Sequence, residues 1–237
     1  MTRRRWIADE VSGNRAALTG DHARHLAQVL RAQVGQEFDI SSGAEVRQGK
    51  LISVHPDRVE FELGEAIAQP EPAQITVAIS IFKFDRMEWA IEECTELGVA
   101  RIVPVIAGRT EKHLAAAAAK RVERWHRIVH QAAEQSRRTS SPEIAQPIKF
   151  KDLFQITGET KIVLSEVEQQ LTLKGALPSD AKSVLLAFGP EGGWTDQELS
   201  AFRETGWKSA SLGNTILRAE TAVIAATAIA LSALHRE

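Results

Sequence analysis

Two glycine-containing loops carry the first sign of chemistry in this sequence. The run GPEGGW at 189–194 follows an apolar segment, 184–188, that is predicted to be a strand. It leads into a predicted helix that Thr195 caps, with Glu198 at the capping-box position. Glycines have no Cβ, so a ligand can lie directly against their backbone. The spacing matches neither the dinucleotide motif G-x-G-x-x-G nor the phosphate loop, and taken alone it is also typical of a tight turn.

The second loop, LGNTILRAETA at 212–222, also leaves a predicted strand, 209–212, and opens an apolar helix, 219–234. Its simplest interpretation is a connecting loop followed by an acid that the helix dipole favours. Two such loops at neighbouring strand ends, both rich in backbone donors, can together surround one flat, adenosine-like ligand. The pair therefore predicts a binding site more specifically than either loop does.

The elements that position these loops alternate between strand and helix. Gly98 ends one predicted helix, and a longer one is expected at about 114–136. Strands that are apolar throughout and separated by helices are typical of a largely parallel sheet covered on both faces, and ligands bind such sheets at the carboxyl ends of the strands. The predicted strands are 75–82, 101–106, 161–165, 184–188 and 209–212.

The first 64 residues have a different pattern. A short helix is predicted at 21–32, with Asp21 as its cap, and period-two alternation predicts strands at 37–40, 46–54 and 59–63. The segment 64–72 contains two prolines and no periodicity, so we expect the linker there. The predicted domains are 1–70, small and mostly β, and 73–237, which is α/β.

Composition limits the class of protein. The 237 residues are 43% hydrophobic and 25% charged, enough for a sizeable core, and no apolar run approaches the roughly 20 residues of a membrane span. The single cysteine, Cys94, fits a reducing cytoplasm and makes a structural zinc site unexpected. His22 and His25 lack an evident third ligand, so no metal is predicted.

The charge pattern limits contact with nucleic acid to local surfaces. The formal net charge of −2 argues against indiscriminate binding to phosphates. Segment 120–138 carries six basic residues against two acidic ones, but on composition alone a solvated helix face is the favoured interpretation.

The two loops in this order resemble the paired signature of the RsmE family, methyltransferases of the knotted SPOUT class. ELGV at 96–99 and EQSRR at 134–138 match two further motifs of that family, and His25-Leu26, Val29-Leu30-Arg31 and Gly35 resemble its PUA-like domain. The resemblance covers essentially the whole chain. One departure is Glu93, where relatives commonly carry a basic residue, and it argues against a phosphate contact from that helix.

The resemblance implies properties that spacing does not reveal. It implies a small N-terminal PUA-like β-barrel that binds RNA and a C-terminal SPOUT α/β domain with a deep trefoil knot, which is an exception to the rule that chains avoid threading. It implies S-adenosylmethionine as cofactor and a homodimer whose active site is completed across the interface. It also implies methylation of N3 of a specific uridine in 16S ribosomal RNA of the small subunit.

The resemblance also assigns site residues. The basic residues and one histidine expected to contact RNA are Arg3, Arg4, Arg5, His25, Arg31, Arg109 and Arg138. The loop residues expected to bind the cofactor are Phe188, Gly189, Pro190, Glu191, Gly192, Gly193, Leu212, Gly213, Ile216 and Leu217.

The reaction suggests three catalytic residues. Uridine N3 carries an imide proton, so the enzyme must remove that proton or stabilise the imide anion. Arg218 is the candidate for stabilising the anion through a uracil oxygen, or alternatively for holding the target phosphate. Glu191 or Glu220 is the candidate proton acceptor, although either can instead bind backbone donors.

Three other functions compete with this one. Both loops serve the cofactor, so a knotted methyltransferase acting on a ribose 2′-hydroxyl or on tRNA fits them as well. A non-catalytic RNA-binding protein of ribosome assembly is a second alternative, against which the intact loop motifs argue. An oxidoreductase is disfavoured, because neither the glycine spacing nor the acidic ribose ligand about 20 residues on is where that fold requires it.

Overall fold

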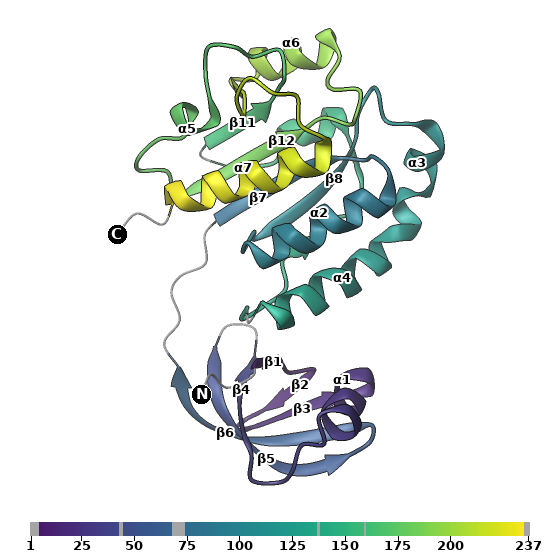
Figure 1. Ribbon diagram of the computed structural model, residues 1–237, viewed down its shortest axis with the longest axis vertical. Coiled ribbons are helices and arrows are strands. Elements are labelled where there is room, and N and C mark those ends of the chain that lie inside the picture. The colour runs from purple at the N-terminus through teal and green to yellow at the C-terminus, as the bar shows by residue number, and fades with distance from the viewer. Residues whose placement is uncertain (1–4, 43–44, 68–73, 137, 159, 235–237) are drawn as a thin grey trace. The chain divides into compact units, whose positions relative to one another are not determined.

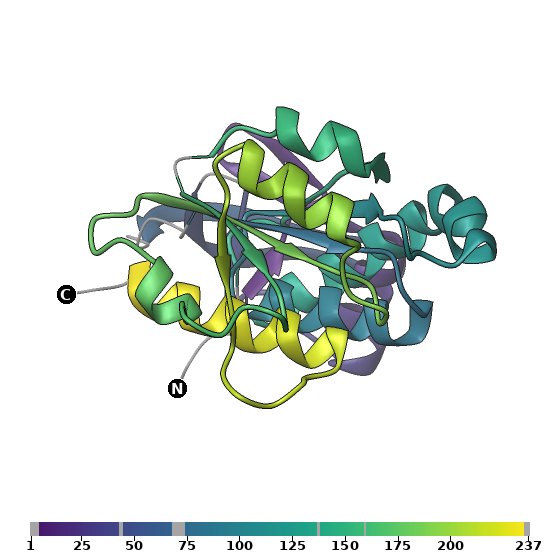
Figure 2. The same ribbon diagram turned by 90° about the horizontal axis from the view of Figure 1, so that it is seen from above.

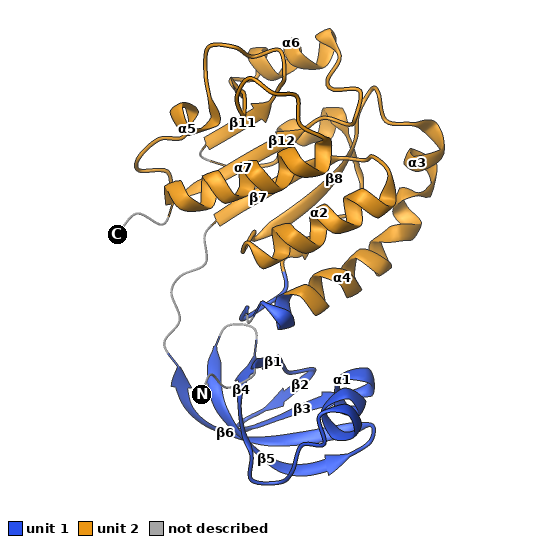
Figure 3. Ribbon diagram, viewed as in Figure 1, with its two compact units in different colours: residues 1–71, 133–141 blue, residues 72–132, 142–237 orange. Residues whose placement is uncertain are grey.

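The computed structural model describes residues 5–42, 45–67, 74–136, 138–158 and 160–234 (Figure 1). The chain divides into two compact units. Unit 1 comprises Met1–Glu71 and Ala133–Ser141, and unit 2 comprises Pro72–Ala132 and Pro142–Glu237 (Figure 3). The first unit thus includes a second, short segment from the middle of the chain, which the predicted boundaries do not contain.

Unit 1 is built around a six-stranded sheet, with neighbours in the order β1-β4-β5-β6-β3-β2. The pair β1 and β4 is parallel and the other pairs are antiparallel. Among the described residues β1 and β2 are the two edges, so the sheet is a curled half-barrel rather than a closed barrel (Figure 1). Its strands are β1 (Arg5–Ile7), β2 (Glu10–Ser12), β3 (Arg15–Thr19), β4 (Glu37–Ser41), β5 (Val46–His55) and β6 (Arg58–Ile67).

The helical segment of unit 1 differs from its prediction. Helix α1 spans Gly20–Arg24 with Thr19 as N-cap, so Asp21 lies within the first turn, where the helix dipole favours an acid. A π-helical turn, His25–Val29, follows directly. The predicted linker also begins too early, because β6 continues to Ile67 and the remainder of 64–72 lies outside the described residues.

Unit 2 contains a seven-stranded sheet in which every described pair is parallel. The order is β10-β8-β7-β12-β11-β13, with β9 beside β8, so β12 lies between two strands that precede it in the chain. This confirms the predicted parallel α/β sheet. Its strands are β7 (Gln74–Ser80), β8 (Arg101–Ile106), β9 (Glu143–Ile144), β10 (Ile148–Lys149), β11 (Thr160–Leu164), β12 (Ser183–Phe188) and β13 (Lys208–Ala210).

Helices cover both faces of this sheet. Figure 2 shows α7 and α6 on opposite sides of the strands. A 3-10 turn divides the predicted helix at 114–136. The sequence does not predict this turn, because helix propensity alone does not distinguish an α-helix from a 3-10 helix. The helical elements are α2 (Phe84–Glu96), α3 (Lys112–Ala117), the 3-10 turn η2 (Ala118–Arg121), α4 (Val122–Gln135), the 3-10 turn η3 (Phe150–Gln155), α5 (Leu173–Ala176), α6 (Asp196–Glu204) and α7 (Ala219–Leu234).

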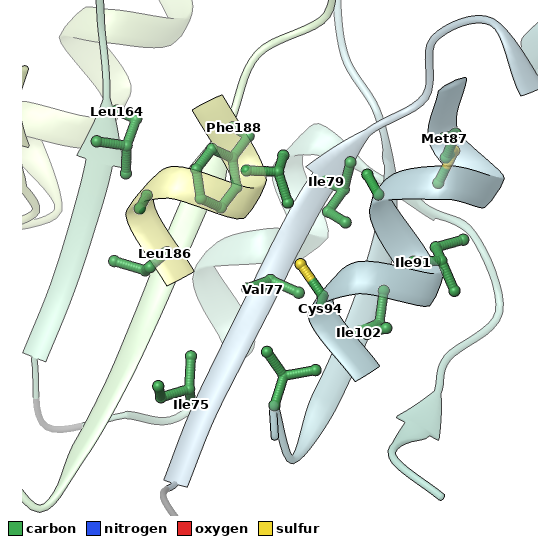
Figure 4. Packing of buried hydrophobic residues seen from close by; sticks show 14 of the residues in the cluster. Ile75, Val77, Ile79, Met87, Ile91, Cys94, Ile102, Leu164, Leu186 and Phe188 are labelled. Atoms are coloured by element: carbon green, nitrogen blue, oxygen red, sulfur yellow. The ribbon is translucent and has the colours of Figure 1, made fainter. Parts of the chain in front are cut away.

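Each face of the sheet has its own apolar core, because alternate residues of a strand point to opposite faces. On β7, Val77 and Ile79 pack with α2 and α7, whereas Ala78 packs with the aromatic cluster that includes Phe202. Figure 4 shows Cys94 of α2 beside the β7 side chains in the first of these cores. None of the described helices, the apolar α7 included, is long and apolar enough to cross a membrane.

Candidate active site

The candidate site lies where β11, β12 and β13 end, at one edge of the unit 2 sheet. A cavity of about 400 Å³ opens there, which is within the size range of small-molecule sites. Residues from both glycine-containing loops and from the end of β11 line it. The lining residues are Arg86, Leu164, Ser165, Glu166, Phe188, Gly189, Pro190, Glu191, Gly193, Ser211, Leu212, Gly213, Asn214, Thr215, Ile216, Leu217, Arg218, Ala219 and Ala222.

The first loop, 189–195, closes tightly on itself. The Gly193 N–H donates to the Pro190 carbonyl at 2.8 Å, and Gly193 has a φ of +68°, a conformation that glycine adopts without strain. A Cβ on Gly189 would lie 3.2 Å from the Gly193 carbonyl carbon. A Cβ on Gly193 would lie 2.3 Å from a carboxylate oxygen of Glu166. The glycines therefore leave room for close backbone packing and for an acid that lines the cavity.

Glu198 fixes the far end of this loop. The predicted capping box is confirmed: Thr195 accepts from the Glu198 N–H, and the Glu198 carboxylate accepts from the Thr195 N–H at 2.9 Å. The other oxygen of that buried carboxylate accepts from the Gly108 N–H at 2.7 Å. One side chain thus joins the helix cap to the loop that follows β8.

Two further contacts hold the first loop. The Arg109 guanidinium donates to the Gly192 carbonyl at 2.5 Å. The Trp194 indole N–H donates to the Leu164 carbonyl at 3.1 Å, and its ring packs against Phe202 with centroids 5.0 Å apart. The end of β11 and the loop after β8 therefore support the same turn.

The second loop, 211–218, is more open. Gly213 has a φ of +119°, and positions 213–216 are exposed, with Ile216 86% exposed. Among the described residues, no hydrogen bond or ion pair engages the side chains of Asn214, Thr215 or Arg218. The loop ends where the Ala222 N–H donates to the Arg218 carbonyl and α7 begins.

The candidate acids occupy different environments. Glu191 is exposed, lines the cavity and accepts from the Lys83 N–H, at the N-terminus of α2, at 3.5 Å. Glu220 is 2% exposed and is absent from the cavity lining. Its carboxylate lies 3.7 Å from the guanidinium of Arg86.

The structure brings most of the predicted cofactor residues together. All of them except Gly192 line the cavity; Gly192 lies beside it, in contact range of Arg109. Sequence reasoning missed Arg86, Ser165 and Glu166. The positions after β11 were detectable as the end of a third predicted strand, whereas no motif drew attention to Arg86.

The predicted RNA residues are spread over both units. In unit 1, Arg5 begins β1, His25 is exposed beside Trp6 with ring centroids 5.9 Å apart, and Arg31 is exposed with a φ of +50°. Burial lowers the pKa of Arg138 to about 10, which leaves it charged at neutral pH. Arg3 and Arg4 lie outside the described residues.

Both Arg109, which is predicted to contact RNA, and Glu93, which argues against a phosphate contact, have protein partners here. Arg109 belongs to unit 2, where it holds Gly192. Glu93 accepts from the Trp89 indole N–H at 3.0 Å, so its carboxylate has a local partner on α2.

The chain matches known proteins along most of its length. Residues 69–231 match the family described as RNA methyltransferase domain, and residues 18–64 match the RNA methyltransferase PUA domain. The chain is 35% identical over 219 residues to ribosomal RNA small subunit methyltransferase E of Synechocystis sp., covering 89% of this chain and 71% of that protein. It is 31% identical to the Bacillus subtilis protein of the same name, covering 87% and 85%.

A solved structure gives the same result. The crystal structure of a ribosomal RNA small subunit methyltransferase E from Neisseria gonorrhoeae, bound to S-adenosylmethionine, superposes with a TM-score of 0.85 at 32% identity and 96% coverage of each chain. These matches confirm the resemblance to the RsmE family. The chain belongs to the ribosomal RNA small subunit methyltransferase E family and is an RNA methyltransferase.

Proposed function

We propose that this protein uses S-adenosylmethionine to methylate N3 of a specific uridine in 16S ribosomal RNA. The observation that carries the proposal is the cavity of about 400 Å³ that both glycine-containing loops enclose at the strand ends. The relative from Neisseria gonorrhoeae was solved with S-adenosylmethionine, and this chain shares its fold along nearly its whole length. Such a substrate also places the protein in the bacterial cytoplasm.

The residues of the cavity fit this cofactor. The loops at 188–193 and 212–217 offer backbone donors and bare glycine surface for a flat adenine. Ser165 and Glu166 supply hydroxyl and carboxylate groups that suit a ribose diol. When bound, the cofactor supplies a methyl group on a positively charged sulfur. The chain's own residues must then exclude water and hold the target uracil in line with that group.

Charged residues at the cavity complete the proposed site. Arg218, exposed and lining the cavity, holds the RNA through a uracil oxygen or the target phosphate. Glu191 is the acid at the cavity that suits proton acceptance. Glu220 is buried away from the lining, which favours a different role for it.

We propose that unit 1 holds the RNA. The support is an exposed His25 on a π-helical turn and Arg31 in a left-handed conformation, features that often accompany binding sites. Arg31→Ala should weaken RNA binding and reduce its dependence on salt by about one counterion, because one phosphate contact is lost. Affinity for S-adenosylmethionine should stay unchanged. An unaltered salt dependence would remove Arg31 from the RNA surface.

We also propose a homodimer and a trefoil knot. Most residues of helix α7 are apolar, and its exposed positions, Thr221, Ala228 and Ser232, are all small, which suits a partner helix. Light scattering should report about twice the chain mass of 26.0 kDa. The knot is supported by the order of the sheet, where β12 enters between β7 and β11, and by the resemblance of the loops on either side.

Nucleoside mass spectrometry of ribosomal RNA tests the reaction. RNA from cells that lack this protein should lose one 3-methyluridine, and the purified protein should restore it to that RNA or to small subunits. Loss of a 2′-O-methyl nucleoside instead, or of a modification in tRNA, would favour the alternative methyltransferases. Unchanged nucleosides together with defective subunit assembly would indicate the non-catalytic function.

A further inference from the structure

A charged residue outside the two loops also lines the cavity. Arg86 lies in the first turn of α2, and its Nε lies 3.7 Å from Oε1 of Glu220 in the first turn of α7. The Arg86 side chain is 34% exposed, whereas that of Glu220 is 3% exposed. A guanidinium at the cavity is therefore backed by a buried carboxylate.

Protein stability does not explain this pair. Within the described chain, Oε2 of Glu220 is buried without a hydrogen-bond partner, which is costly for a carboxylate. The N-terminus of α7 and the Arg86 charge offset part of that cost. Replacing a buried ion pair by apolar residues is often neutral or stabilising, so a fold that needed only stability would not require the pair.

The reaction gives the pair a role, and this inference rests on the proposed function. The N3 lone pair forms the new bond to the methyl carbon, the electrons of the carbon–sulfur bond remain on sulfur, and the N3 proton passes to a base or to water. Negative charge that develops on N3 spreads to the two uracil carbonyl oxygens. A cation held in advance beside one of these oxygens lowers the barrier.

We propose that Arg86 is a catalytic residue that donates to a uracil carbonyl oxygen and stabilises the imide anion. Glu220 is a positioning residue that fixes the Arg86 guanidinium. Its burial keeps it from contacting substrate, so it acts through Arg86 rather than as the base.

The other charged groups of the cavity leave this role to Arg86. Glu191 and Glu166 are acids, and their charge opposes that of the anion. Arg218 is exposed and engages no partner among the described side chains, so it must be ordered when RNA binds. Arg86 is already held in place. The two arginines therefore have separate roles: Arg218 holds an RNA phosphate, and Arg86 stabilises the anion of the reacting uracil.

Rates measured against pH test the assignment. Single-turnover methylation at saturating RNA should fall about 100-fold near neutral pH in Arg86→Gln, a loss typical of one preorganised donor. The rate should recover as pH rises, because the imide then ionises without help. Glu220→Gln should show a smaller loss with the same displacement of the profile, and Arg86→Lys should retain part of the rate.

The controls separate chemistry from folding and binding. Arg101→Gln removes a similarly exposed arginine of unit 2 that pairs with Glu143 at 3.1 Å and does not line the cavity, and its profile should match the wild type. Calorimetry should give S-adenosylmethionine affinities within about threefold of the wild type, since each tenfold is about 1.4 kcal/mol. Thermal unfolding reports whether each variant folds.

Each outcome decides the proposal. A rate loss in Arg86→Gln that is equal at every pH, or a profile that superimposes on the wild type, overturns it. If Arg86→Gln does not fold, the profiles of Arg86→Lys and Glu220→Gln decide by the same criterion. Wild-type protein that makes no 3-methyluridine would instead refute the proposed function.

Discussion

The two loops that enclose the cavity are supported in opposite ways. Three hydrogen bonds, made by Glu198, Arg109 and Trp194, fix the first loop to the loop after β8 and to the end of β11. The second loop exposes four consecutive residues, 213–216, and within the described chain no hydrogen bond or ion pair holds the side chains of Asn214, Thr215 or Arg218. One wall of the site is therefore built before ligands arrive, whereas the other is free to adapt to them.

This difference suits a methyltransferase with two substrates. A preformed wall lowers the cost of ordering when the smaller ligand binds. An adaptable wall can close over that ligand and present Arg218 and Ile216 to RNA. Changes in the first loop should therefore affect folding and binding together, and changes in the second should affect binding alone.

The largest effect is expected from Glu198→Ala. This variant removes half of the capping box and leaves the Gly108 N–H without its acceptor, which should cost about 2–3 kcal/mol of unfolding free energy. Denaturant unfolding measures it, and Glu204→Ala, at an exposed position of the same helix, is the control. Equal stabilities of the two variants would mean that the first loop is not pinned as described.

Comparison of Gly193→Ala with Gly206→Ala should distinguish the cost of backbone strain from an effect of the new Cβ on the cavity. Gly193 and Gly206 have similar φ values, +68° and +78°, so alanine at either should cost about 1–2 kcal/mol of stability. Only the Cβ at 193 meets Glu166, at 2.3 Å, whereas that at 206 meets open space. Displacement of Glu166 should weaken S-adenosylmethionine binding about tenfold in Gly193→Ala, which is about 1.4 kcal/mol. Calorimetry that shows equal affinities for Gly193→Ala and Gly206→Ala would contradict this.

Much of this site was predictable, because periodicity reports strands and the carboxyl ends of parallel strands share one edge. The strand ends at 188 and 212 located both loops, and Thr195 with Glu198 predicted the cap. Arg86 was not predictable, since it reaches the cavity through the packing of α2 against α7, and tertiary contacts leave no local pattern. Gly192 shows the reverse: it belongs to the motif, yet the turn directs it toward Arg109.

The fold was less predictable in unit 1. Strands β1, β2 and β3 have few alternating positions, and β2 is exposed at every residue, so no periodicity marks it. The π-helical turn at His25–Val29 follows an α-helical pattern in sequence, and the extra residue in its turn has no local signal.

Ile216→Ser should sharpen the comparison from the second loop. The Ile216 side chain is 86% exposed, so its replacement should change the free energy of unfolding by less than about 0.5 kcal/mol. Binding of S-adenosylmethionine or RNA should weaken about tenfold if a ligand covers it. Val167→Ser, 65% exposed and outside the cavity lining, is the control. Unchanged affinities, with dimers that dissociate more readily, would assign Ile216 to the subunit interface.

The smallest effect is expected at Cys94, where α2 packs against α7. This thiol is fully buried on α2 and lies 3.5 Å from the Thr227 hydroxyl of α7, and burial raises its pKa to about 12 (Figure 4). Thiolate is the reactive form, so at pH 8 iodoacetamide should label denatured protein quickly and folded protein hardly at all.

The raised pKa of Cys94 also makes the stability of the protein depend on pH. Because the folded pKa is raised, the stabilising contribution of the neutral thiol is complete below its unfolded pKa and is lost as pH rises toward 12. The unfolding free energy of Cys94→Ala should accordingly fall less than that of the wild type above about pH 9.

Labelling of Cys94 with and without S-adenosylmethionine tests whether the change on ligand binding is confined to the second loop. If α7 were as adaptable as the loop before it, S-adenosylmethionine would slow labelling of the folded protein. We expect equal, very slow labelling with and without this ligand. The contact between α2 and α7 lies in the apolar core that these helices form with the sheet, and not in the second loop.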